Sequence, residues 1–248
     1  MKSRVFLFIS LSFVFILAWS SIGWSQAPRE DAETTAQHLA TLLNVGRIVI
    51  DRNQTLINDP RKGDKGFTPE VFEHEIVDEY NRQTSIDLKH LPTHLPSLAK
   101  ELLPVLLESS KEVVADAQFV INQRGIAYKN FIPATFGSQA ARKFSNRSYV
   151  KIKQTTLNPR NLKNTPDAYE ENVLKRLARQ PASNTSVTDW IDNETTLRAM
   201  TPIYYSQECL ACHGNPKGIL DISGYPREGA QEGDLAGAIS IQIPMKSR

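Results

Sequence analysis

The hydrophobic positions in the first half of the chain recur at the three- and four-residue steps of amphipathic helices. A first helix is expected over residues 31–58. Its apolar face carries Ala36, Leu39, Leu43, Ile50 and Ile57. Thr68 and Pro69 then supply a cap and a first-turn residue for a second helix. That helix carries Val71, Phe72, Ile76 and Tyr80. A third helix is expected over residues 97–122, and Pro104 either kinks it or marks its start.

Beyond residue 145 the pattern alternates with the two-residue period of half-buried strands. Val150 and Ile152 alternate with lysines in the first predicted strand. Two extended runs follow at residues 187–205 around an Asp-Asn-Glu turn, and Pro202 makes the second run an edge or bulged strand. One face of that run carries Leu197, Ala199, Ile203 and Tyr205. The last strand directs Ile239, Ile241 and Ile243 to one side and Ser240 and Gln242 to the other.

A further helix is expected between the first two of these strands. Thr165 supplies its cap and Pro166 its first residue, and acidic residues precede basic ones along it, as the helix dipole favours. About four antiparallel strands therefore follow a helical N-terminal half, which is an α+β arrangement.

The start of the chain has the pattern of an export signal. Two basic residues in MKSR precede an apolar run at residues 5–19, and Gly23 and Ser25 are small residues suitably placed for cleavage before Gln26. We predict a signal peptide at residues 1–25 and a periplasmic or otherwise exported protein. The alternative is an uncleaved membrane anchor, because the uncharged stretch at 5–27 is just long enough to span a bilayer.

The composition narrows the partners and the source of stability. The chain has 29 Lys and Arg residues against 27 Asp and Glu residues, a formal net charge of +2, which indicates no nucleic acid or acidic partner. It has only two cysteines, so no disulfide framework holds the exported part together. Its core must come from hydrophobic burial.

Those two cysteines form the motif CLACH, in which Cys209 and Cys212 precede His213 inside a long connection rich in glycine and proline. A zinc site needs four ligands, and no second ligand pair completes one. A thiol–disulfide pair normally opens a helix in a βαβ unit, which this region does not resemble. Covalent haem fits best. Two thiols at this spacing form thioethers to one porphyrin, and the next imidazole binds the iron as an axial ligand.

Four stretches around this motif recur together in a known family. The order of these stretches resembles, over nearly the whole mature chain, a bacterial family of PAS-like c-type haem domains, first catalogued as a domain of unknown function. They are FIPATFG at 131–137, TTLNPRNLKNTPDAYEENVLKRL at 155–177, TPIYYSQECLACHG at 201–214 and GYPREGAQEGDLAGAISIQIP at 224–244. The resemblance implies one domain at residues 26–248, with a PAS-like antiparallel sheet flanked by helices and one covalent haem c.

The resemblance implies two roles, free periplasmic proteins and extracytoplasmic sensor domains. In signalling members a membrane helix and a transmitter follow the last strand, whereas this chain stops at MKSR. We therefore expect any sensing to act through a separate signalling protein.

The sixth iron ligand is where this chain departs from part of the family. Some members are thought to place a cysteine thiolate across the haem, at a position that corresponds here to Phe131. Both cysteines are already committed to thioethers, so thiolate ligation is excluded. The remaining candidates are His38, His74, His90, His94, Met200 and Met245. His38, His94 and Met200 are weak candidates, and iron left open beneath an apolar lid that contains Phe131 is the alternative.

Arg160 and Asn161 are candidate partners of the haem propionates, since a forked guanidinium suits a carboxylate. The alternative is a turn that only positions the following helix.

These residues favour a protein that senses redox state or a diatomic gas through its haem. The second reading is a periplasmic one-electron carrier that serves a redox partner. A haem enzyme of the peroxidase or nitrogen-oxide reductase type would need distal acid–base residues, and no such pair can be recognised in the sequence. We therefore expect no enzymatic activity.

Overall fold

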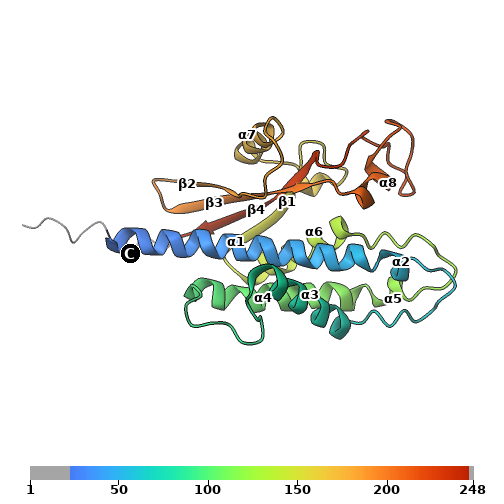
Figure 1. The fold of residues 1–248 in the computed structure, drawn as a ribbon, viewed down its shortest axis with the longest axis horizontal. Helices are drawn as coiled ribbons and strands as arrows, with labels where there is room; N and C mark the ends of the chain where they lie inside the picture. The colour runs from blue at the N-terminus through green and yellow to red at the C-terminus, as the bar shows by residue number, and fades with distance from the viewer. Residues whose placement is uncertain (1–22, 246–248) are drawn as a thin grey trace, which may run out of the picture.

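Helices cover both faces of a four-stranded antiparallel sheet in the computed structural model, which describes residues 23–245 (Figure 1). The predicted signal peptide at 1–25 lies outside the described residues except for its last three, which already belong to the first helix. Among the described helices, none is both long enough and apolar enough to cross a membrane.

The helical half follows the sequence pattern. It consists of α1 (Gly23–Arg52), α2 (Gln54–Ile57), α3 (Pro69–Thr84), α4 (Ser97–Asp116), α5 (Gln118–Ile121) and α6 (Pro133–Arg147). The predicted apolar face of the first helix is buried, and Thr68 caps α3 by accepting from the backbone N–H of Val71. Val71, however, is 40% exposed. α4 begins at Ser97 as expected and contains Pro104, but it ends at Asp116, and α5 completes the predicted span.

Helix α6 was not among the elements that the pattern predicts. Phe136, Ala140 and Phe144 form its buried face, and α6 packs between α1, α4 and the first strand. Gly46 of α1 allows this close packing, because a Cβ at position 46 would lie 2.6 Å from the Phe136 ring.

The sheet and its flanking helix confirm the predicted α+β fold, a PAS-like antiparallel sheet behind a helical N-terminal half. Its strands are β1 (Lys151–Thr155), β2 (Val187–Ile191), β3 (Thr196–Tyr204) and β4 (Leu235–Pro244), in the spatial order β1-β4-β3-β2. Ile239, Ile241 and Ile243 join the main core under the long helices, as predicted. On the other face, Met200 and Ala238 pack under α7 (Ala168–Leu177) in a smaller apolar cluster.

One local prediction was confirmed only in part, and another was wrong. β3 lies between β4 and β2, so Pro202 does not mark an edge strand, but the bulged alternative is confirmed by the register shift between Ile203 and Tyr204. β3 tolerates it because Pro202 lies beyond Met200, the last residue paired to β2, and next to a register shift at Ile203 and Tyr204. Asp167, rather than Thr165, caps α7, because its carboxylate accepts the N–H of Glu170 while the Glu170 side chain accepts the N–H of Asp167.

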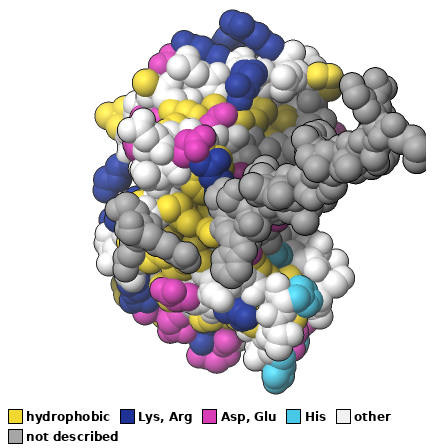
Figure 2. Space-filling view, turned by 90° about the vertical axis from the view of Figure 1, so that its left-hand side faces the viewer, with side chains coloured by type: hydrophobic (Ala, Val, Ile, Leu, Met, Phe, Trp, Pro, Cys, Tyr) yellow, Lys and Arg dark blue, Asp and Glu magenta, His cyan; other side chains and the backbone are white. Residues whose placement is uncertain are grey.

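Figure 2 views the end of the molecule on the left of Figure 1, where positive and negative side chains alternate around exposed hydrophobic ones. α8 (Leu210–His213), which carries most of CLACH, lies at the other end of the molecule (Figure 1).

Candidate functional site

CLACH occupies the short helical segment that follows β3. Cys209 ends the 3-10 turn η2 (Gln207–Cys209), and Cys212 and His213 lie in α8. Both cysteines are free thiols and partly exposed. Gly214 ends α8, and a Cβ at this position would lie 2.6 Å from the carbonyl oxygen of Leu210. The chain therefore turns sharply just after His213 and leaves the two thiols and the imidazole on one short segment.

One nitrogen of His213 is already engaged. The Nδ1 atom lies 2.8 Å from Oε2 of Glu228, and the Tyr205 hydroxyl lies 3.5 Å from the same nitrogen. The Tyr205 ring also packs against the imidazole, with 4.9 Å between the ring centroids. A carboxylate can only accept, so Nδ1 is the donor in this bond, and Nε2 is left as the ring nitrogen that can bind a metal.

Arg160 connects this histidine to the rest of the site. Its guanidinium donates to both oxygens of Glu228, to Asp221 at 2.6 Å and to the carbonyl of Cys212 at 3.0 Å. Burial raises the pKa of Glu228, but hydrogen bonds from Arg160 and His213 outweigh it and hold that pKa below its usual value. Glu228 is therefore an ionised acceptor between a cation and an imidazole.

Asp221 organises the connection that follows CLACH. Its side chain is fully buried and accepts from the backbone N–H groups of Ser223 and Tyr225 as well as from the Ser223 hydroxyl. Burial raises its pKa, but the bonds from Ser223 and Arg160 outweigh it and hold the pKa far below the usual range. Burial also raises the pKa of the Cys212 thiol, and the Asp221 charge acts in the same direction.

Two residues from the helical half reach the same segment. Tyr128, in the loop before α6, lies beside Ser223, and burial followed by the charges of Cys212 and Asp221 raises its pKa. Arg47 of α1 is near Cys209: burial lowers its pKa, and the Cys209 charge opposes that effect. The Nε atom of Arg47 is buried and has no hydrogen-bond partner among residues 23–245.

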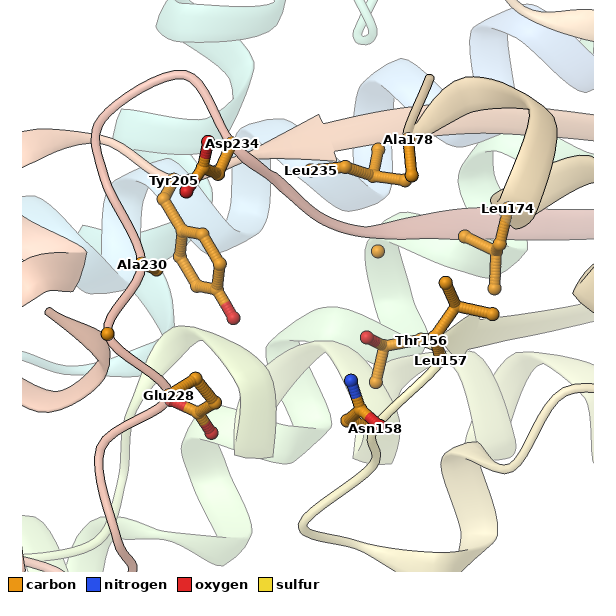
Figure 3. A pocket seen from close by; sticks show the side chains of 12 residues that line it. Thr156, Leu157, Asn158, Leu174, Ala178, Tyr205, Glu228, Ala230, Asp234 and Leu235 are labelled. Carbon is orange, nitrogen blue, oxygen red and sulfur yellow. The ribbon is translucent and has the colours of Figure 1, made fainter. Parts of the chain in front are cut away.

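A cavity of 240 Å³ lies between α7 and the connection, and its lining includes Tyr205 and Glu228. Figure 3 shows the hydroxyls of Tyr205 and Thr156 pointing toward its centre. Burial, followed by the nearby Glu228 charge, raises the pKa of Tyr205 to about 12, so its hydroxyl stays protonated. The two residues that contact Nδ1 of His213 therefore also line an open space.

The comparisons with known proteins decide the family. The sequence profile described as Tll0287-like matches residues 26–244. The chain belongs to the Tll0287-like family. A solved structure, the cyanobacterial heme-protein Tll0287, is 16% identical over 62% of this chain and 98% of its own, with a TM-score of 0.43. No curated protein matches the chain.

This result confirms the predicted resemblance, and the structure brings three of the four Tll0287-like stretches together. Arg160 comes from the stretch at 155–177, the carbonyl of Cys212 from 201–214 and Glu228 from 224–244. The fourth stretch, at 131–137, opens α6 in the helical layer. The roles of Glu228 and Asp221 were not visible in the sequence, although Glu228 lies inside a recurring stretch.

The other predicted site residues lie at different places in this Tll0287-like fold. Phe131 is buried in the main core, and its carbonyl accepts from Gln54 of α2. The Asn161 side chain is turned to its own backbone, where it accepts the N–H of Lys163 and caps a 3-10 turn. Their roles toward haem stay predictions.

The candidate sixth ligands are held elsewhere. His38 lies in α1 with its Nδ1 atom 2.8 Å from the Tyr80 hydroxyl of α3. Met200 is fully buried under α7. His94 is exposed in the connector between α3 and α4, at the end of the helical layer remote from α8 (Figure 1). His74 and His90 pair with nearby aspartates on the surface, and Met245 packs against the main core.

Proposed function

We propose that this protein binds one haem covalently, with thioethers at Cys209 and Cys212 and with Nε2 of His213 as an axial ligand. The observation that carries the proposal is the state of His213, whose Nδ1 atom is taken by Glu228 beside two free thiols at the required spacing. Membership of the Tll0287-like family, whose solved member is a heme-protein, supports the same cofactor.

Other residues near CLACH fit a porphyrin. Large apolar side chains are exposed at neighbouring positions of the connection, and exposed apolar clusters of this kind often mark a binding site. They are Ile219, Leu220, Ile222 and Tyr225. The unpaired Nε of Arg47, near Cys209, is complementary to a carboxylate such as a haem propionate. A flat apolar group with acidic edges matches both features.

Haem would supply an iron that changes oxidation state or takes up a diatomic gas. We propose that the protein uses this iron for redox or gas sensing, as an exported, non-enzymatic domain that acts through a separate signalling protein. What supports the sensor role is the placement of His38, His94 and Met200, because each is engaged or lies away from α8. An open sixth position suits a ligand sensor.

Haem staining of a denaturing gel, together with a pyridine haemochrome spectrum, tests the attachment. The exported wild type should keep its stain, and the Cys209→Ser/Cys212→Ser variant should lose it. Haem lost from the denatured wild type would refute covalent attachment.

Carbon monoxide tests the role. The ferrous protein should bind it with a sharp Soret shift, and His38→Ala and His94→Ala variants should bind it equally well. If the ferrous wild type does not bind carbon monoxide and one alanine variant does, that histidine is the sixth ligand and the protein is an electron carrier.

A further inference from the structure

The carboxylate of Glu228 is shared between two partners that compete for its charge. Its Oε2 atom lies 2.8 Å from Nδ1 of His213 and 3.0 Å from Nη2 of Arg160. Its Oε1 atom lies 2.8 Å from Nε of Arg160. The Arg160 guanidinium therefore binds the Glu228 carboxylate through two parallel hydrogen bonds. The Oε2 atom, which faces the imidazole, accepts one of them.

Arg160 cannot easily leave this position. Asp221, which is fully buried, holds its Nη1 atom at 2.6 Å, and the Cys212 carbonyl accepts from Nη2. The Tyr225 ring lies under the guanidinium, with 5.4 Å from its centroid to Cζ. Arg160 is therefore fixed on several sides, and the distribution of the Glu228 charge is set by the fold rather than by a mobile side chain.

We infer that Glu228 is the positioning residue for His213 and that Arg160 limits how strongly Glu228 polarises the imidazole. This inference rests on the proposed haem ligation by His213. A carboxylate that draws on the Nδ1 proton makes Nε2 a stronger donor to iron, which stabilises the ferric state. Arg160 withdraws part of that charge, which favours the ferrous state. The iron potential then depends on the balance between these two residues.

The balance predicts shifts of opposite sign in two haem-loaded variants. In Glu228→Gln the charge is lost, so the midpoint potential should rise. In Arg160→Gln the whole carboxylate charge acts on His213, so the midpoint should fall. We expect at least a tenfold change in the reduction equilibrium in each direction, which is ~59 mV for a one-electron couple.

A matched control separates hydrogen bonding from charge alone. Glu208→Gln removes the same charge from an exposed position beside Cys209, whereas the carboxylate that pairs with His213 is that of Glu228. Glu228→Gln should lower the iron–histidine stretching frequency of the ferrous protein in resonance Raman spectra. Glu208→Gln should leave that frequency unchanged and shift the potential less than Glu228→Gln does.

The inference would be overturned if the midpoint potentials of Glu228→Gln and Arg160→Gln moved in the same direction. It would also be overturned if the iron–histidine stretching frequency of Glu228→Gln equalled that of the wild type. If Glu228→Gln yields no haem protein, the inference is tested with Arg160→Lys, which keeps the positive charge. Its midpoint potential should lie closer to that of the wild type than the midpoint potential of Arg160→Gln does. Equal midpoint potentials in Arg160→Lys and Arg160→Gln would overturn the inference. Failure of haem attachment itself is seen separately, as a wild type without covalent haem.

Discussion

The helical layer, which consists of α1 to α6, and the connection between α8 and β4, residues 214–234, are held together by different interactions. In the helical layer, side chains such as Leu43, Phe72 and Phe136 are fully buried in one continuous apolar core. In the connection, large apolar side chains such as Leu220 and Ile222 are exposed, and Asp221 and Arg160 hold the backbone through hydrogen bonds. Stability thus comes from burial in one region, while the other keeps an apolar surface and charged groups available for a ligand.

The largest effect should come from the helical core. Phe136→Ala removes a fully buried ring that packs on Phe72 at 5.3 Å between centroids. We expect a loss of about 3–5 kcal/mol in the free energy of unfolding, measured by urea denaturation. Val71→Ala, at a partly exposed site of α3, is the control and should change stability by less than about 0.5 kcal/mol. Equal losses in both variants would contradict a core centred on Phe136.

A smaller loss is expected at the contact between α1 and α6. Gly46→Ala places a methyl group 2.6 Å from the Phe136 ring, so the ring or the helix must shift. We expect a loss of about 1–3 kcal/mol by the same measurement. The double variant Gly46→Ala/Phe136→Ala should lose less than the sum, because the smaller side chain leaves room for the methyl group. Additive losses would argue against this contact.

In the connection, a substitution should act locally. Asp221→Asn removes the charge that Arg160 and the turn around Ser223 share. We expect faster hydrogen exchange over residues 217–228, while the urea midpoint of the whole protein falls much less than in Phe136→Ala. Asp189→Asn, which removes the charge from the acceptor of the Tyr169 hydroxyl of α7, is a control that should leave exchange at 217–228 unchanged. Exchange that rises equally across the helical layer would show that the two regions are not separate.

The smallest effect concerns His38. Burial lowers its pKa in the folded protein, so the unfolded chain takes up a proton more readily below the ordinary value of about 6.5. The neutral imidazole therefore contributes stability that is present above pH 6.5 and is lost as the pH falls toward the lowered pKa. The unfolding free energy should decrease over that interval. His38→Asn should show a flatter profile, whereas an unchanged slope would assign the dependence to other groups.

The sequence predicted most of the regular elements because their hydrophobic periods are unambiguous. The faces of α1 and β4 are buried as their spacing requires, and CLACH is a local motif that needs no fold to be recognised. Helix α6 was missed, although Phe136, Ala140 and Phe144 stand at four-residue steps, because glycine and small residues dilute its pattern. Pro202 predicted an edge or a bulged strand, and only the fold decides between the two, because strand order determines which strand lies at an edge.

The surroundings of His213 depend on the fold and were therefore out of reach of the sequence. Glu228 lies fifteen residues beyond His213, and Arg160 contacts Glu228 across 68 positions of the chain. No local spacing brings these three residues together. Arg47 was not singled out in the sequence, and its buried Nε atom near Cys209 is seen only in the folded chain.

The intact mass of the exported protein under denaturing conditions tests the central claim most directly. The wild type should start at Gln26 and carry the added mass of one haem. The Cys209→Ser/Cys212→Ser variant should have the mass of the polypeptide alone. If the wild type has no added mass when it is made in cells that attach haem to other c-type cytochromes, this protein does not bind haem covalently. Haem mass retained in the double variant would exclude attachment through Cys209 and Cys212.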